Sequence, residues 1–447
     1  MVSQLNRKIL KGGLIFDIER KRKFTADILI EGSLIKEISD DLRDDHAEVI
    51  DMSGRWLMPA FIDPHAHLRE PGREDEETIE SGITAAINGG FCAIACMPNT
   101  DPAIDDPSIL KFILDKSKRF CPQFRLLPVA AITRGRKGKE ISEIGLLKSA
   151  GAFAFSDDGS SVVDAYIMRR ALEYGNSFRV LFILHEEDLL LSEGGQMHEG
   201  YYSTLLGLKG IPWTAETTFV ARDVLLALDS GARIHFAHIS SVRSVDIMDF
   251  AKDMGADVSA EVNFHNLIFC DEDLKTYDTN LKINPPMRSS DDRKALIASA
   301  RSGQISMICS DHAPHASHEK ELDFDLAPFG VIGLDLMPAA VFSELVFKKK
   351  LDEFRAIEMM TSGPAKLFGL GSVDIRAGSI ANIAVMDPNV EMVVNDRFLQ
   401  SKSKNTPFLG KKLKSSLTDL FLAGTQVKKN GEVLIQVSKS KIEINSK

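Results

Sequence analysis

The chain has 447 residues, of which 44% are hydrophobic and 26% are charged. These fractions are ordinary for a folded globular protein and exclude the disordered and fibrous classes. The 54 lysines and arginines are outnumbered by 64 aspartates and glutamates, which gives a net charge of −10. A net negative charge argues against a main function in binding nucleic acid or a membrane surface, because both carry negative phosphates.

No segment of the sequence predicts a membrane anchor or an exported protein. No apolar run approaches the roughly 18 residues needed to span a bilayer. The N-terminal residues lack the apolar core and cleavage site of a signal peptide. The five cysteines are odd in number and include no CxxC pair, so neither a disulfide framework nor a cysteine zinc site is expected. We therefore expect a cytoplasmic protein.

The two ends of the chain have the pattern of short β-strands. Within residues 1–57, apolar and polar residues alternate at close to period two, as in half-buried strands. Residues 371–447 repeat the pattern, and Lys429-Asn430-Gly431 predicts a tight hairpin turn. We expect the two ends to combine into one small β domain.

The middle of the chain, residues 58–370, predicts an α/β fold. Nearly continuous apolar runs alternate with segments of helical spacing, which indicates a parallel sheet covered by helices. Eight such units over about 300 residues match a (β/α)8 TIM barrel. The expected helices include 75–90, 163–175, 215–231 and 241–255. An open doubly wound sheet is the alternative, and it is disfavoured because no GxGxxG follows a strand and no GxxxxGK[ST] occurs.

Histidines and aspartates occur where the predicted barrel strands end. Alternate residues of a strand point the same way, so His65 and His67 should project together into the barrel mouth. Later strands end at Asp157-Asp158, His185, His238 and Asp311. In a barrel the carboxyl ends of all strands meet at one rim, which is where active sites lie.

Each of these residues, taken alone, has an ordinary structural explanation as a turn, a loop cap or a core histidine. Burying several imidazoles and carboxylates together without a cation costs several kcal/mol in desolvation, however. Four histidines and two aspartates suit Zn²⁺ or a similar ion, and six ligands exceed one tetrahedral site. The residues therefore predict two metal ions that share a bridging carboxylate and a bridging hydroxide.

Six short motifs follow one another along the chain: HAHLREPG (65–72), MPNT (97–100), FSDDG (155–159), NPPMR (284–288), DHAPH (311–315) and APFGVIGLD (327–335). Together they resemble the class I dihydroorotases of the cyclic amidohydrolase superfamily, over nearly the whole chain. The resemblance implies a metal-dependent TIM barrel with a small β domain from both termini. It also implies the reversible cyclisation of N-carbamoyl-L-aspartate to L-dihydroorotate in pyrimidine biosynthesis.

The resemblance implies roles for the residues at the strand ends. One Zn²⁺ would be held by His65, His67, Asp158 and Asp311, and the other by Asp158, His185 and His238. The choice of Asp158 over Asp157 as the bridge rests on the family's spacing to His185. Hydantoinases have a carboxylated lysine at the end of this strand, and the segment GAFAFSDD contains no lysine. Asp311 would be the catalytic general base and acid.

The resemblance also implies which residues bind the substrate. Arg69 would hold the substrate carboxylate, because a planar guanidinium matches a carboxylate with two parallel hydrogen bonds. The further implied contacts are His67, Asn99, Asn284, His315 and the backbone of Phe329 and Gly330.

Other polar residues near the rim are expected to be structural. His235 is three positions from His238 and should pack against a helix, and His198 should lie on the surface or in a loop. Residues 73–75 should begin a helix with acids near its positive end. The chain has Asn263 where family members usually have threonine. This difference leaves open which side chains surround the metal ligands and how the substrate loop is arranged.

Two alternatives to a dihydroorotase remain. A related cyclic amidohydrolase of the allantoinase or hydantoinase type is disfavoured by Arg69 together with Asn99. A non-catalytic scaffold or regulatory subunit is disfavoured because all six ligand positions are filled. The superfamily resemblance further implies a homodimer, and it allows an association with aspartate carbamoyltransferase.

Overall fold

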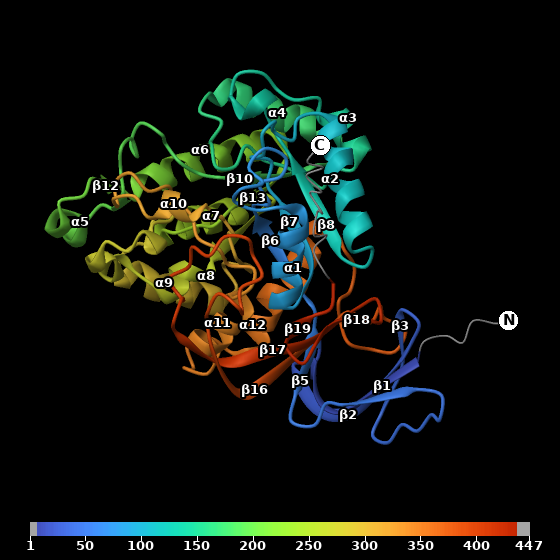
Figure 1. Cartoon of the computed structure of the whole chain (residues 1–447). Helices are drawn as coiled ribbons and strands as arrows, with labels where there is room; N and C mark the ends of the chain where they lie inside the picture. Colours follow the sequence, from blue (N-terminus) through green and yellow to red (C-terminus); the bar gives the residue numbers. More distant parts are fainter. Residues whose placement is uncertain (1–6, 436–447) are drawn as a thin grey trace, which may run out of the picture.

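Eight parallel strands form a barrel in the middle of the chain (Figure 1). The structure is a computed structural model that describes residues 7–435. The strands pair in chain order, and the first and last meet at a parallel bridge between Ala66 and His312, which nearly closes the barrel. This arrangement confirms the predicted TIM barrel. The strands are β6 (Phe61–Ala66), β7 (Phe91–Cys96), β8 (Arg125–Ala130), β9 (Ala154–Phe155), β10 (Leu181–Leu184), β13 (Arg233–Phe236), β14 (Val258–Asn263) and β15 (Met307–Cys309).

The barrel strands are rich in apolar residues, as is usual for parallel strands that are covered on both faces. Their side chains fill the interior of the barrel. Every residue of β6 and of β7 is buried. Fully buried phenylalanines come from five strands, namely Phe61, Phe91, Phe155, Phe182 and Phe236. Each such side chain contributes roughly 2–3 kcal/mol by leaving water, so the strands form a rigid base beneath their carboxyl ends.

Helices follow the barrel strands and begin and end at recognisable residues. The helix α1 (Ile79–Gly89) begins after Thr78, whose hydroxyl accepts from the Ser81 N–H, and it ends at Gly90 with a φ of 89°. A capping hydroxyl and a left-handed glycine are common helix boundaries. The expectation that residues 73–75 begin this helix is wrong, since the acidic segment before Thr78 is a loop.

Four helices lie close to the predicted ranges, namely α1, α4 (Ala165–Asn176), α6 (Thr214–Ser230) and α7 (Val242–Asp253). Further helices are α2 (Pro107–Phe120), α3 (Ile144–Ala150), α9 (Ser290–Ser302), α12 (Glu353–Met360) and α13 (Ser362–Phe368). Short elements fill the connections: α5 (Tyr201–Leu206), α8 (Phe264–Ile268), α10 (Ser317–Lys320), α11 (Met337–Val341), β11 (Met197–His198), β12 (Gly210–Ile211), single 3₁₀ turns at Arg134–Arg136, Asp271–Thr276 and Thr279–Leu281, and a π-helical turn at Phe342–Val346. Within the described part of the chain, no helix is long and apolar enough to cross a membrane.

The two ends of the chain share a second, mostly antiparallel sheet. In Figure 1 the blue N-terminal strands lie beside the red C-terminal strands, and β5 pairs with β16 between them. The hairpin predicted at Lys429-Asn430-Gly431 is confirmed, because Lys429 pairs with Glu432 across a two-residue turn. The strands are β1 (Arg7–Asp17), β2 (Arg22–Glu31), β3 (Leu34–Ser39), β4 (Glu48–Asp51), β5 (Trp56–Pro59), β16 (Ile383–Val393), β17 (Lys412–Leu422), β18 (Thr425–Lys429) and β19 (Glu432–Val433).

Candidate metal centre and substrate site

The carboxylate of Asp158 lies between two pairs of histidines at the barrel mouth. Its Oδ2 is 3.3 Å from Nε2 of His65 and 3.6 Å from Nε2 of His67. Its Oδ1 is 3.4 Å from Nδ1 of His185 and 3.3 Å from Nε2 of His238. All five side chains are buried. Each oxygen of one carboxylate therefore faces its own pair of imidazole nitrogens, which is the arrangement that a bridging ligand requires.

Asp311 lies on the His65–His67 side of this group. Its Oδ1 is 3.3 Å from Nε2 of His67 and 3.7 Å from Nε2 of His65. Burial raises the pKa of the Asp311 carboxyl, but the neighbouring histidines outweigh burial and lower it. Asp311 and His238 also have φ values of 44° and 32°, a conformation that costs free energy in non-glycine residues and is concentrated at functional sites.

Asp157 points away from the histidines. Its carboxylate accepts hydrogen bonds from the Thr133 backbone N–H at 3.0 Å and from the Thr133 hydroxyl. The structure therefore brings Asp158, and not Asp157, into the histidine group.

The hydrogen-bonding state of the histidines fits a bound cation. Nδ1 of His65 lies 2.9 Å from a Glu261 oxygen, and because a carboxylate only accepts, this nitrogen carries the hydrogen. Nε2 of His65 is buried and has no hydrogen-bond partner within residues 7–435. Nδ1 of His185 and Nε2 of His238 are 3.1 Å apart. Such nitrogens are costly to bury unless a cation or a proton lies between them.

Around Asp158 and Asp311, two sets of three ligand atoms lie close enough together to hold a metal ion. The members of each set are within 4.8 Å of one another, and the sets are His65, Asp158 and His238, and His65, His67 and Asp311. Histidine nitrogens and aspartate oxygens are the ligands that Zn²⁺ and related divalent ions bind. The residues present therefore suit a divalent metal.

Electrostatics at the centre also favour cations. Burial lowers the pKa of His65, but the carboxylates of Asp158 and Glu261 outweigh burial and raise it well above its usual range. For His185, burial also lowers the pKa, but the carboxylates of Asp158 and Glu187 outweigh burial and raise the pKa to about 10. For Asp158, burial raises the pKa, and the surrounding histidines outweigh burial and hold it well below its usual range. Negative charge is thus concentrated where a cation would bind.

Glu261 contacts the ring nitrogen of His65 that lies opposite the one facing Asp158. This residue was not predicted from the sequence. Besides His65, it contacts Nε2 of His235 at 3.1 Å. The expectation that His235 packs against a helix is therefore wrong. The strand β13 ends at Phe236 and His238 has a left-handed backbone, so the alternation of side chains does not extend from His235 to His238. The sequence contained one indication of this role, a glutamate inside the apolar run of β14. Buried carboxylates are rare unless they are paired, so such a residue predicts a buried partner.

Glu187 and Asn99 contact ring nitrogens of His185 and His67. Glu187 contacts Nε2 of His185 at 3.1 Å and accepts from Asn284 at 2.9 Å. Oδ1 of Asn99 lies 2.7 Å from Nδ1 of His67. If each ring nitrogen in these contacts carries its hydrogen, the opposite nitrogen is left with a lone pair that faces Asp158. Asn99 and Asn284 thus lie next to the ligands.

The remaining predicted substrate contacts lie beside the cluster on loops. Nε of Arg69 donates to the carbonyl of Pro314 and lies 3.0 Å from an oxygen of Glu76, with which Arg69 forms an ion pair. Nδ1 of His315 contacts the same Glu76 carboxylate at 2.9 Å, and Nε2 of His315 lies 2.8 Å from the carbonyl oxygen of Phe329. One carboxylate therefore brings Arg69 and His315 together.

Two buried lysines hold the loop that contains Phe329 and Gly330. Nζ of Lys282 donates to the carbonyl of Ala327 at 2.7 Å, and its own carbonyl accepts from the Gly330 N–H at 2.9 Å. Nζ of Lys320 donates to the carbonyls of Pro328 and Gly330. Burial lowers the pKa of Lys282 to about 8 and that of Lys320 to about 7. These contacts fix the loop.

Comparison with known proteins decides the family. Residues 54–244 match the family model described as dihydro-orotase-like. The chain is 44% identical over 406 residues to a dihydroorotase of Pelotomaculum thermopropionicum, covering 91% of this chain and 95% of that protein. It is 42% identical over 408 residues to a dihydroorotase of a Thermoanaerobacter species, covering 91% and 94%. The chain belongs to the dihydroorotase family. The resemblance seen in the six motifs is thereby confirmed.

Solved structures of more distant proteins have the same fold as this dihydroorotase family member. The L-hydantoinase (dihydropyrimidinase) of Arthrobacter aurescens superposes with a TM-score of 0.85 at 23% identity, covering 97% of this chain and 98% of that one. The dihydropyrimidinase of Brevibacillus agri gives 0.80 at 22% identity, covering 96% of each. These likenesses confirm the barrel with its second sheet.

Asn263 contacts Asp311, and it is a position at which this dihydroorotase family member departs from the usual motif. Nδ2 of Asn263 donates to Oδ2 of Asp311 at 3.0 Å. Oδ1 of Asn263 lies 2.6 Å from Nδ1 of His265. The asparagine therefore links His265 to Asp311, a contact that the motif comparison did not anticipate.

Proposed function

We propose that this protein is a dihydroorotase, which interconverts N-carbamoyl-L-aspartate and L-dihydroorotate. The observation that carries the proposal is the shared carboxylate of Asp158 between two histidine pairs, with Arg69 close by on the neighbouring loop. The dihydroorotases that match over more than nine-tenths of the chain support the same substrate.

We further propose that two Zn²⁺ ions bind at the mouth of the barrel. One would be held by His65, His67, Asp158 and Asp311, and the other by Asp158, His185 and His238. When bound, such ions supply Lewis-acid activation of water and of a carbonyl group near neutral pH.

Asp311 would move the proton that the reaction requires. In hydrolysis of the ring, a carbon–oxygen bond to water forms, the amide carbon–nitrogen bond breaks, and the proton lost by water ends on the ring nitrogen. Asp311 is an anion held by His67 and Asn263, so its carboxylate is suited to accept that proton and return it. In the synthetic direction, the protonated carboxyl would assist the loss of water as the ring closes.

The loop side of the site would hold the carboxylate of the substrate. Arg69 contacts the protein through Nε, which leaves its terminal nitrogens to face a ligand. The Asn99 amide would complete this contact and His315 would lie beside it, while Asn284 and the loop of Phe329 and Gly330 would border the ring. A guanidinium fork favours a carboxylate, and hydantoin and allantoin lack one.

Parallel assays of the purified chain test the proposal. We expect loss of dihydroorotate absorbance at a rate far above that with hydantoin or allantoin, and about two equivalents of zinc per chain. Asp311→Asn should retain the fold and lose turnover. Faster turnover of hydantoin or allantoin would favour the alternative amidohydrolase, and absence of both metal and turnover would favour a non-catalytic scaffold.

The assembly and location of the protein stay predictions. A homodimer should give twice the chain mass by light scattering. Association with aspartate carbamoyltransferase should be seen as co-elution of the two purified proteins, and a cytoplasmic location as recovery in the soluble fraction of its cells.

A further inference from the structure

Glu76 is a buried carboxylate on the loop between β6 and α1, and it contacts two arginines and a histidine. Its side chain is only 2% exposed. Oε2 lies 3.0 Å from Nε of Arg69, and Oε1 lies 2.9 Å from Nδ1 of His315 and 3.2 Å from Nη2 of Arg73. Two of these three partners, Arg69 and His315, belong to the proposed substrate-carboxylate side of the site. A negative group so close to an anion-binding site needs a reason, because like charges repel.

The backbone of Glu76 is held in place independently of its carboxylate. Its carbonyl accepts from the Ser403 hydroxyl at 2.7 Å, and its N–H donates to the carbonyl of Arg73. A fixed carboxylate can restrict mobile partners. The arginine side chain otherwise loses up to about 2 kcal/mol of conformational entropy when it is ordered by a ligand.

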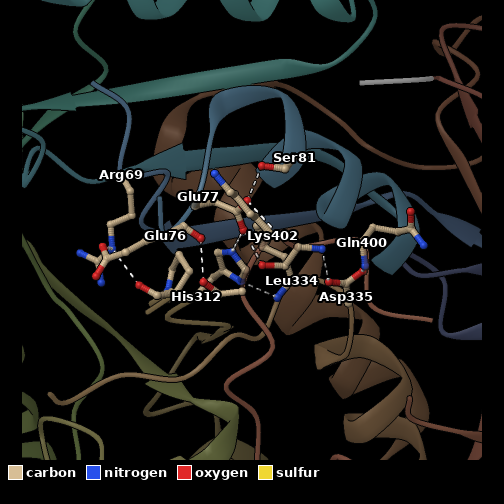
Figure 2. A network of polar contacts seen from close by, with 12 residues as sticks. Arg69, Glu76, Glu77, Ser81, His312, Leu334, Asp335, Gln400 and Lys402 are labelled. Carbon is tan, nitrogen blue, oxygen red and sulfur yellow. Dashed lines mark hydrogen bonds and ion pairs between the residues drawn. The ribbon is translucent and has the colours of Figure 1, made fainter. Parts of the chain in front are cut away.

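The neighbouring Glu77 makes a different set of contacts. Figure 2 shows Glu76 reaching toward Arg69, and Glu77 toward His312. Glu77 contacts Nε2 of His312 at 3.1 Å and accepts from the Lys402 N–H at 3.1 Å. It therefore ties the chain after β15 to the loop before β17. Of these two adjacent glutamates, only Glu76 contacts the proposed substrate-binding side chains.

We propose that Glu76 is a positioning residue, which fixes Arg69 in the orientation in which its guanidinium meets the carboxylate of the substrate, and which holds His315 beside it. The inference rests on the proposed dihydroorotase function. Glu76 binds Nε of Arg69 and leaves the two terminal nitrogens of the guanidinium for the ligand. By holding the Arg69 side chain before the substrate arrives, it lowers the ordering cost of binding.

The variant Glu76→Gln tests this role, because glutamine keeps the size of the side chain and removes its charge. In the zinc-loaded enzyme, we expect KM for dihydroorotate to rise about tenfold, since charge-assisted hydrogen bonds are stronger than neutral ones. We expect kcat to change less than about threefold and zinc content not to change, because Glu76 does not contact a metal ligand. Glu76→Asp should recover part of the affinity. Glu74→Gln, an exposed glutamate on the same loop, is the matched control.

A ligand without the carboxylate separates positioning from a structural role. Dihydrouracil has the same ring as dihydroorotate but no carboxylate, so its inhibition constant should change less than about twofold in Glu76→Gln. Arg69→Lys combined with Glu76→Gln should weaken dihydroorotate binding less than the product of the two single effects. The inference would be overturned if Glu76→Gln weakened the binding of dihydroorotate and of dihydrouracil equally. It would also be overturned if the effect of the double variant equalled the product of the two single effects. A wild-type enzyme that does not turn over dihydroorotate would instead overturn the proposed function, and this inference with it.

Discussion

The proposed metal-ligand cluster and the proposed substrate-carboxylate side of the site are built from different parts of the fold. The cluster consists of buried side chains at the ends of five barrel strands, namely His65, His67, Asp158, His185, His238 and Asp311. On the other side, Arg69 and His315 lie on loops, and their side chains are 12% exposed. The barrel therefore determines where charge is concentrated, and the loops determine which part of a ligand meets it.

Both regions nevertheless contain buried or half-buried glutamates that contact the proposed functional side chains. Glu261 and Glu187 contact the far nitrogens of His65 and His185, whereas Glu76 contacts Arg69 and His315. Because a carboxylate only accepts hydrogen bonds, it selects which nitrogen of a partner remains for the ligand. For His65 and His185 the remaining group is a lone pair that can face a cation, and for Arg69 it is the terminal nitrogens, which can donate to an anion.

The largest effect is expected for His65→Ala, which removes a ligand from the centre of the cluster. We expect kcat/KM to fall by more than about 1,000-fold, because a bound metal contributes several kcal/mol to the transition state. At least one equivalent of metal should be lost, as measured by elemental analysis. The exposed His46→Ala is the control. Full metal content in His65→Ala would show that the cluster is not the metal site.

Glu261→Gln tests whether the residues behind the cluster act on metal affinity. The amide keeps the shape but can present an NH₂ group to His65, which disturbs the tautomer. We expect zinc affinity to fall about 10- to 100-fold, the usual effect of changing such a partner, as measured by competition with a chelator. A variant that binds zinc like the wild type would show that Glu261 serves only the packing of the barrel.

The two regions also differ in how far the sequence predicts them. Barrel strand ends converge for any (β/α)8 pattern, so His65, His185 and Asp311 were placed together by counting strands. The orienting glutamates were missed because their partners, such as His235 for Glu261, are close only in three dimensions. Glu76 was missed because the acidic segment before Thr78 has the composition of a helix start, and only tertiary contacts show that it is a loop with two buried carboxylates.

Arg69→Lys separates the two regions directly. A lysine ammonium retains the charge but lacks the planar fork, so KM for dihydroorotate should rise about tenfold or more, while metal content stays that of the wild type. Steady-state kinetics and elemental analysis on the same preparation provide both values. If the substitution strips the metal, Arg69 belongs to the cluster and the division between the two regions fails.

The smallest effect concerns a histidine outside the cluster, whose pKa shifts in the direction opposite to those of His65 and His185. His198 was expected on the surface or in a loop, but it is 8% exposed, and its Nδ1 lies 3.4 Å from Nη1 of Arg288 in the NPPMR loop. Burial, followed by the charge of Arg288, lowers the pKa of His198 from 6.5 to about 4.

Between these two pKa values the unfolded chain binds the proton at His198 and the folded chain does not, so the folded state loses stability as pH falls through this window. At pH 5.5 the loss is about 1 kcal/mol relative to pH 7. His198→Asn keeps an acceptor for Arg288 and cannot titrate. The difference in unfolding free energy between variant and wild type, measured by urea at both pH values, should therefore shift by about 1 kcal/mol in favour of the variant at pH 5.5. A difference that is the same at both pH values would mean that His198 titrates normally, and that burial beside Arg288 does not lower its pKa.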